Sequence, residues 1–154
     1  MRIEDCIKIK GFLDDYHRVT VNVVYTSNWL TTILEHRANH HGITLQQFNA
    51  LRILRGQYPN VASNAMIRER MVTGTPDISR LVDRLVLKGL VFRHKNVTDK
   101  RAVDVKITQK GLQLLEDIEE EMMLSKNLCQ NLTTEEACLL SHLLDKLRGK
   151  ESII

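Results

Sequence analysis

Residues 76–88 combine an apolar stripe with a polar face that carries two arginines, a serine and two carboxylates. If the segment is a helix, the spacing i, i+3, i+4 and i+7 brings together Ile78, Leu81, Val82 and Leu85. The opposite face presents Asp77, Ser79, Arg80, Asp83 and Arg84. Arginine can pair with guanine, and a carboxylate can accept from the cytosine amino group. The serine hydroxyl can donate to or accept from a base edge. This face predicts base-edge contacts, and a solvated face with weak ion pairs is the alternative.

A second polar cluster lies in RHKNVTDKRAVDVKIT, residues 93–108, where β-branched runs flank a charged tip. The tip holds Asp99, Lys100 and Arg101. A cationic hairpin beside a base-reading helix can enter the neighbouring minor groove, where a narrow A·T-rich stretch attracts arginine. We expect Asp99 to be a structural partner that holds an arginine of the hairpin. An ordinary polar turn is the alternative.

The elements that position these groups begin with helices. Apolar spacing predicts a long helix over about 12–39, ended by Gly42. Thr44 and Gln47 then form a capping-box pattern at the start of the next helix. Its buried stripe is expected to be Phe48, Leu51 and Leu54. Ser63 is expected to cap a short helix of about 64–71.

The predicted base-reading helix follows a tight connection, VTGT. Thr75 is the expected N-cap, Pro76 suits the first turn, and the helix should run to about Lys88 before Gly89. Strands are expected at 90–95 and 102–107. Helix, helix, tight turn, helix and hairpin is the layout of a winged helix-turn-helix, whose second helix enters the major groove.

Two helices are expected after the hairpin. The first should run from Thr108 to about Cys129, and Thr133 with Glu136 forms a capping box for the second. The fold class predicted is mainly α with a small β-hairpin. It is a winged helix-turn-helix core flanked by helices that form a dimerisation region.

Charge is distributed unevenly along the chain. Residues 64–111 hold 11 Lys/Arg against 5 Asp/Glu, whereas residues 112–154 hold 4 against 9. A basic middle suits an anionic partner such as double-stranded DNA, and a chance fluctuation of surface charge is the alternative. No apolar run approaches the roughly 20 residues of a membrane span, so no membrane partner is expected. The charged start and three cysteines without a C-x-x-C spacing favour a reducing cytoplasm.

The sequence resembles the multiple-antibiotic-resistance regulator (MarR) family over nearly its whole length. The segment ISRLVDRLVLKGLV looks like that family's base-reading helix and first wing strand. DKRAVDVKITQKG fits the wing pattern Asp-x-Arg-x-x-x-Val-x-(Leu/Ile)-Thr-x-x-Gly, and GITLQQFNALRIL resembles the helix before the reader.

The resemblance implies a homodimeric transcription regulator, usually a repressor, that binds a pseudo-palindromic operator. By resemblance, Arg101 would enter the minor groove together with the cationic tip at Lys100. Ser63 and Asn64 would meet phosphate. The major-groove residues would be Thr75, Pro76, Asp77, Ser79, Arg80 and Arg84.

One MarR-like domain is predicted over 1–154, with about 44–108 as the winged helix-turn-helix. Residues of about 1–40 and 109–150 are the expected dimerisation helices. Their apolar stripes are wider than a domain of this size covers internally, which favours a homodimer.

The sequence contains weaker signals for an effector site or for a function other than DNA binding. Family members commonly release DNA when a small aromatic or amphipathic effector binds, but the ligand-binding residues here are unknown. His36 and His40 have zinc-compatible spacing without a third ligand, and Cys6 has no neighbour that lowers its pKa, so no metal or cofactor is expected. A metal- or redox-sensing member of the family is one alternative, and a winged protein–protein adaptor that reads no DNA is another. No enzyme motif is found, so an enzyme is not expected.

Overall fold

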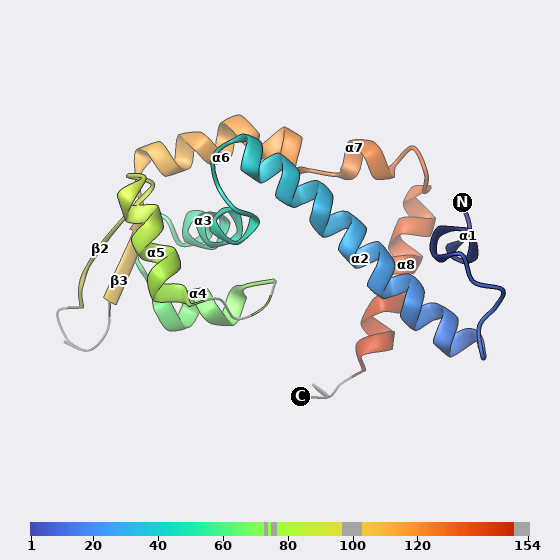
Figure 1. Cartoon of the computed structure of the whole chain (residues 1–154). Coiled ribbons are helices and arrows are strands. Elements are labelled where there is room, and N and C mark those ends of the chain that lie inside the picture. Colours follow the sequence, from blue (N-terminus) through green and yellow to red (C-terminus); the bar gives the residue numbers. More distant parts are fainter. Residues whose placement is uncertain (73, 75–76, 97–102, 150–154) are drawn as a thin grey trace. The chain divides into compact units, whose positions relative to one another are not determined.

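Helices dominate the chain, and one small antiparallel sheet lies among them (Figure 1). The computed structural model describes residues 1–72, 74, 77–96 and 103–149. The chain divides into two compact units, Met1–Ile118 and Glu119–Ile154. The predicted fold class, mainly α with a small β element and a winged helix-turn-helix core, is confirmed.

The first unit contains most of the elements. They are α1 (Ile3–Ile7), α2 (Asp15–His40), α3 (Leu45–Gln57), β1 (Ala62–Ser63), α4 (Asn64–Arg70), α5 (Ile78–Leu87), β2 (Val91–Lys95), β3 (Val103–Ile107) and most of α6 (Gln109–Met122). The second unit holds the end of α6, then α7 (Ser125–Leu128) and α8 (Thr134–Arg148).

Side-chain caps set the starts of the helices, as the sequence predicted at Thr44, Ser63 and Thr133. Thr44 and Thr133 each form a complete capping box, with Gln47 and Glu136 as partners. The Ser63 hydroxyl accepts from the backbone N–H of Met66 at 3.1 Å. These caps satisfy backbone N–H groups that a helix start leaves unpaired.

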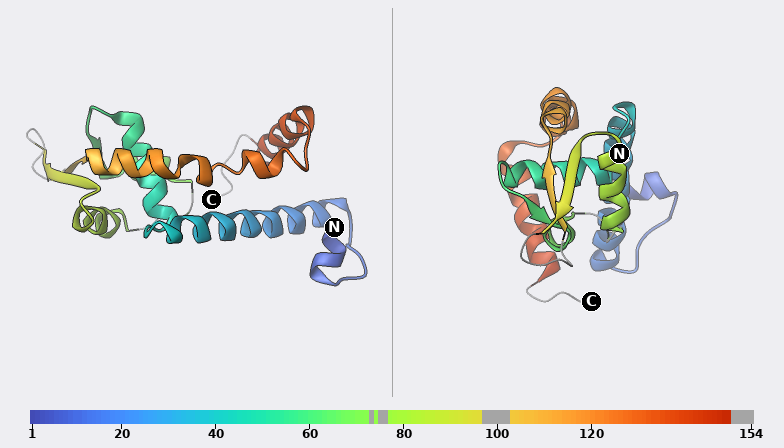
Figure 2. Two further views of the ribbon diagram at one scale, coloured as in Figure 1. Left: turned by 90° about the horizontal axis from the view of Figure 1, so that it is seen from above. Right: turned by 90° about the vertical axis from the view of Figure 1, so that its left-hand side faces the viewer.

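The sheet has the strand order β1-β3-β2, and both of its pairings are antiparallel. β2 and β3 form the expected hairpin, with Val91 opposite Ile107 and Lys95 opposite Val103. The two-residue β1 is an addition to the prediction. It pairs Ala62 with Val105 and therefore places β3 in the centre of the sheet. α5 packs against β2, and α3 and α4 against β3 (Figures 1 and 2).

The core of the first unit lies between these helices and the sheet. It consists mainly of the stripes of α3 and α5 with strand residues, namely Phe48, Leu51, Leu54, Ile67, Ile78, Leu81, Val82, Leu85, Val91, Val105 and Ile107. The predicted stripes of α3 and α5 are both buried. At the junction of the sheet with α6, a Cβ on Gly111 would lie 2.3 Å from the carbonyl oxygen of Leu90. Only glycine fits this close approach.

Two predicted boundaries are wrong. The N-cap of α5 is Asp77, not Thr75, because the Asp77 carboxylate accepts from the backbone N–H of Arg80 at 3.2 Å and the helix begins at Ile78. The helix predicted from Thr108 to about Cys129 is broken: α6 ends at Met122, the last buried residue of that stripe. Leu124 is the N-cap of the separate α7, which begins at Ser125.

No helix in the described ranges is long and apolar enough to cross a membrane.

Candidate nucleic-acid interface

The outer face of α5 is the centre of the candidate interface. Burial of the apolar stripe fixes the rotation of this helix, so that Ser79, Arg80 and Arg84 are exposed. The side chain of Arg80 is 82% exposed, and its Nε lies 3.4 Å from an oxygen of Asp77. Asp77 therefore both caps the helix and pairs with the arginine one turn on. The result is a cationic, hydrogen-bonding surface at the start of a helix, as the sequence predicted.

Asp83, on the same outer face, has a partner within the protein that the sequence did not predict. Its carboxylate forms an ion pair with the guanidinium of Arg93 in β2, and each side chain is about half exposed. This pair links the outer face of α5 to the first strand of the hairpin. Asp83 is thereby engaged within the protein, which leaves Arg80 and Arg84 as the prominent charged groups of that face.

The helix that precedes α5 presents its N-terminus through Ser63 and Asn64. Ser63 ends β1 and caps α4, so the sheet sets the position where α4 begins. α4 packs against α5, and this pair with its connection is the helix-turn-helix. Within the connection, Thr75 and Pro76 lie outside the described residues.

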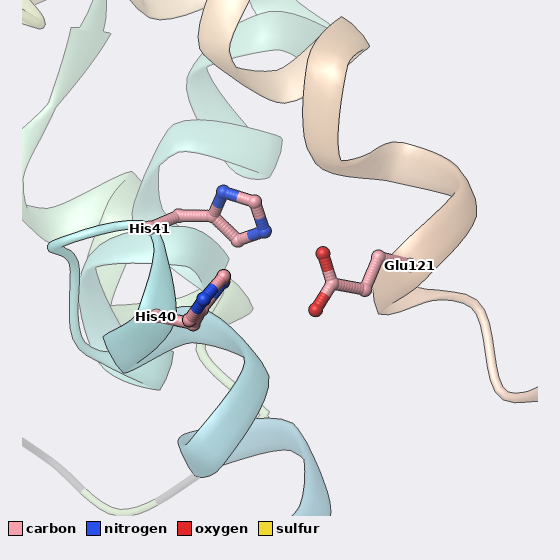
Figure 3. A group of neighbouring side chains, drawn as sticks. All are labelled: His40, His41 and Glu121. Carbon is pink, nitrogen blue, oxygen red and sulfur yellow. The ribbon is translucent and has the colours of Figure 1, made fainter.

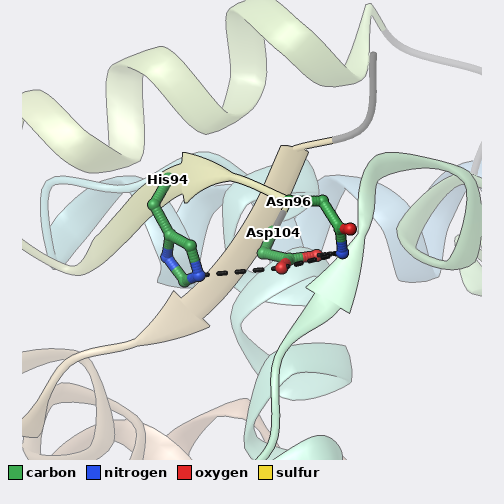
Figure 4. Close-up of polar contacts among 3 residues, drawn as sticks. All are labelled: His94, Asn96 and Asp104. Carbon is green, nitrogen blue, oxygen red and sulfur yellow. Dashed lines mark hydrogen bonds and ion pairs between the residues drawn. The ribbon is translucent and has the colours of Figure 1, made fainter. Parts of the chain in front are cut away.

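The hairpin is described up to Asn96 and again from Val103. The three predicted tip residues, Asp99, Lys100 and Arg101, lie outside the described residues. Where the two strands end next to the tip, the carboxylate of Asp104 accepts from the side-chain amide of Asn96, with Nδ2 3.0 Å from each oxygen (Figure 4). His94 lies on the other side, with Nε2 3.6 Å from Oδ2.

This Asp104 cluster was missed from the sequence. Asn96 and Asp104 are 8 residues apart, and only the pairing register of the hairpin brings them together. His94 is the direct cross-strand partner of Asp104. An Asp within a β-branched run, opposite a His, was the signal that could have pointed to the pair.

The two histidines that follow one another at the C-terminal end of α2 pack edge to face. The ring centroids of His40 and His41 are 5.4 Å apart, with an interplanar angle of 87° (Figure 3). His40 is the last residue of α2, where a cation is favoured by the helix dipole. The third side chain in Figure 3, Glu121, belongs to the second unit.

Cys6 of α1 lies beside Tyr25 of α2. A hydrogen bond with the Cys6 side chain, the electrostatic interaction with that group and slight desolvation raise the pKa of the Tyr25 hydroxyl. Cys6 is partly buried, whereas Cys129 and Cys138 are exposed.

An open hollow of about 530 Å³ lies between the start of α3 and the end of α5. Its lining combines amide, cationic and apolar groups, namely Asn39, Gly42, Ile43, Thr44, Gln47, Arg84, Leu87 and Lys88. Arg84 therefore belongs both to this hollow and to the outer face of α5.

Together, the helix pair α4–α5, the exposed cations of α5 and the three-stranded sheet with its hairpin define a winged helix-turn-helix protein. The model of the MarR family matches residues 41–102. The multiple antibiotic resistance protein MarR of Escherichia coli (strain K12) is 40% identical over 72 residues, which are 46% of this chain and 50% of that protein.

Solved structures extend the likeness over most of the chain. A MarR variant from E. coli complexed with operator DNA is 25% identical, with a TM-score of 0.73 and coverage of 90% of this chain and 99% of that one. NadR in complex with 4-hydroxyphenylacetate is 27% identical, with a TM-score of 0.65 and coverage of 86% and 94%. The chain is therefore similar to the MarR family, whose model matches residues 41–102. The sequence match spans about half the length of the curated relatives.

Proposed function

We propose that this protein is a dimeric, sequence-specific transcription regulator that represses by binding a pseudo-palindromic operator in double-stranded DNA. The observation that carries the proposal is the outer face of α5. A buried stripe on the opposite side holds its arginines exposed, and the ion pair of Asp83 with Arg93 ties the helix to the hairpin. A regulator of this kind needs no catalytic group, so we do not propose an enzyme.

We propose the following contacts for the helix-turn-helix. α5 lies in the major groove, where Ser79, Arg80 and Arg84 face base edges, and Thr75, Pro76 and Asp77 meet DNA at the start of the helix. Ser63 and Asn64 lie against phosphate at the start of α4.

The tip of the wing supplies the remaining contacts. Lys100 and Arg101 reach the minor groove, and Asp99 is the structural partner that holds the tip. The excess of 11 Lys/Arg over 5 Asp/Glu in residues 64–111 supports a polyanionic partner for this part of the chain.

Dimerisation is supported by the apolar side chains that α2 and α8 leave exposed. They include Val24 and Trp29 in α2 and Leu139, Leu140, Leu143 and Leu147 in α8. We propose that residues of about 1–40 and 109–150 form the dimerisation region around the winged residues of about 44–108. A two-fold axis would place two α5 helices about 34–36 Å apart, one turn of DNA.

A small aromatic or amphipathic effector that releases the DNA is part of the proposal. The relative NadR was solved with the aromatic acid 4-hydroxyphenylacetate, which supports this ligand class. The proposed location is the cytoplasm, where operator DNA is accessible.

The test is binding of genomic DNA fragments, followed by a salt titration on the selected operator. We expect selection of a two-fold-related sequence and an affinity that falls steeply with salt, because a dimer displaces several counterions from phosphates. Failure to bind any DNA at low salt would favour the protein–protein adaptor instead. For the effector, addition of aromatic acids should release the operator and raise the melting temperature of the free protein.

A further inference from the structure

Asp104 is an unusual residue for its position in the sheet. Its strand neighbour Val105 is fully buried in the core, so alternation places the Asp104 side chain on the opposite face. Asp104 is nevertheless only 9% exposed. A carboxylate removed from water is costly unless hydrogen bonds compensate for the lost hydration. Asp104 therefore needs hydrogen-bond partners within the protein.

Those partners lie across the hairpin, at the point where the chain departs for the wing tip. Asn96 follows Lys95, the last residue of β2, and its amide donates to both carboxylate oxygens, with Nδ2 3.0 Å from each (Figure 4). His94 flanks the other side at 3.6 Å and pairs electrostatically when its imidazole is protonated. The carboxylate thus bridges the two strands immediately before the tip residues.

Asp104 also occupies the central position of a row across all three strands. Its register partner in β2 is His94, and its register partner in β1 is Ser63, which caps α4. On the other side of β2, Arg93 is paired with Asp83 of α5. The strands next to the wing tip are therefore connected to the start of α4 through Ser63 and to the outer face of α5 through Asp83.

We propose that Asp104 is a positioning residue for DNA binding, which acts by clamping Asn96 and thereby fixing the base from which Lys100 and Arg101 reach the DNA. The inference rests on the proposed function. A hydrogen bond to an ionised group is stronger than a neutral one, and a preorganised loop loses less conformational entropy when it binds.

The direction in which one substitution changes DNA affinity distinguishes this positioning role from a purely electrostatic effect. Asp104→Asn removes a negative charge near a polyanion, so electrostatics alone would strengthen DNA binding. If the clamp operates, the same substitution weakens binding, because the neutral side chain forms a weaker bond with Asn96. Asn96→Ala removes the other partner without any change of charge and should weaken binding as well.

The experiment measures the affinity of the full-length protein for the operator selected by the wild type. We expect a loss of about tenfold for Asp104→Asn and for Asn96→Ala, the size of one hydrogen bond to a charged group. The matched control is Asp117→Asn, because Asp117 of α6 is an exposed carboxylate that also accepts from an amide, that of Gln113 at 2.9 Å. This control should not weaken operator binding.

A second readout isolates the wing. In an Arg101→Ala background, Asp104→Asn should cost little further affinity, because the clamp acts through the tip. A purely structural role would lower the melting temperature and reduce affinity by the same factor in both backgrounds. If Asp104→Asn does not fold, the same double-mutant comparison with Arg101→Ala is made with Asn96→Ala.

The outcomes distinguish the two proposals. Wild-type protein that binds no DNA would overturn the proposed function, and the positioning role with it. If the wild type binds DNA but Asp104→Asn and Asn96→Ala bind as tightly or more tightly, the positioning role alone is overturned. It is also overturned if the losses of affinity in these variants add to the loss in Arg101→Ala.

Discussion

The winged region and the long helices of this protein differ in how much of their apolar surface is buried within the chain. From Ile43 to Ile107, the apolar faces of α3, α5 and the sheet meet one another and form a closed core. In the 26 residues of α2 only Ala38 is buried, and α8 has no buried residue. Burial of a large apolar side chain is worth about 1.5–3 kcal/mol, so the exposed leucines of α8 represent unrealised stabilisation. The winged region is closed within one chain, and under the proposed function the long helices are covered by a second copy.

The largest effect should come from a charge placed on the apolar face of α8. Leu143→Asp would bury an unpaired carboxylate in the proposed dimer interface, so we expect dimerisation to weaken at least about 100-fold. Analytical ultracentrifugation measures this directly. Ser141→Asp adds the same charge at an exposed polar position of the same helix and should leave the dimer intact. An unaltered dimer in both variants would show that α8 does not need a partner.

Arg101→Ala tests whether the winged region works through its tip. We expect operator affinity to fall about tenfold or more, because a cation in the minor groove is lost, with the dimer and the melting temperature unchanged. Fluorescence anisotropy with labelled operator gives the affinity. Arg148→Ala removes an arginine from α8 and serves as the control, for which the same affinity as the wild type is expected.

Arg80→Ala should change the preference for bases more than the overall affinity. A bidentate contact with guanine discriminates by about 1–3 kcal/mol, so loss of Arg80 should relax specificity at one base pair in each half-site. Binding to operators mutated at single positions measures this. An equal loss on every sequence would assign Arg80 to phosphate instead.

The smallest effect should be seen at the ion pair of Asp83 with Arg93. Both side chains are about half exposed, and solvent screens such pairs, so Asp83→Asn should cost no more than about 1 kcal/mol of stability. A double-mutant cycle with Arg93→Gln in urea denaturation gives the coupling energy. A coupling energy of zero would mean that this pair does not help to hold the hairpin against α5.

Local signals in the sequence were sufficient for most of the fold. Caps at Thr44, Ser63 and Thr133 and the stripes of α3 and α5 depend on residues close in the chain, and all are present in the structure. The cap of α5 was misassigned because Thr75 and Asp77 are both good capping residues, and only the observed hydrogen bond distinguishes them.

Features that depend on tertiary pairing were not predictable in the same way. β1 contains two residues, too few for any alternation pattern, and it exists because Val105 and Asp104 of β3 pair with it. The Asp104 cluster likewise requires the register of the hairpin. In the candidate site, residue types identified the outer face of α5, but only the fold showed that Asp83 is engaged by Arg93.

The strand order β1-β3-β2 leaves β2 with a free outer edge among the described strands. Such an edge can recruit a strand from another molecule and start aggregation, and charged side chains along it discourage that. β2 has Arg93, His94 and Lys95 in its last three positions. Two copies that approached edge to edge would bring cationic side chains together, so we expect charge to oppose self-association through this edge of the sheet.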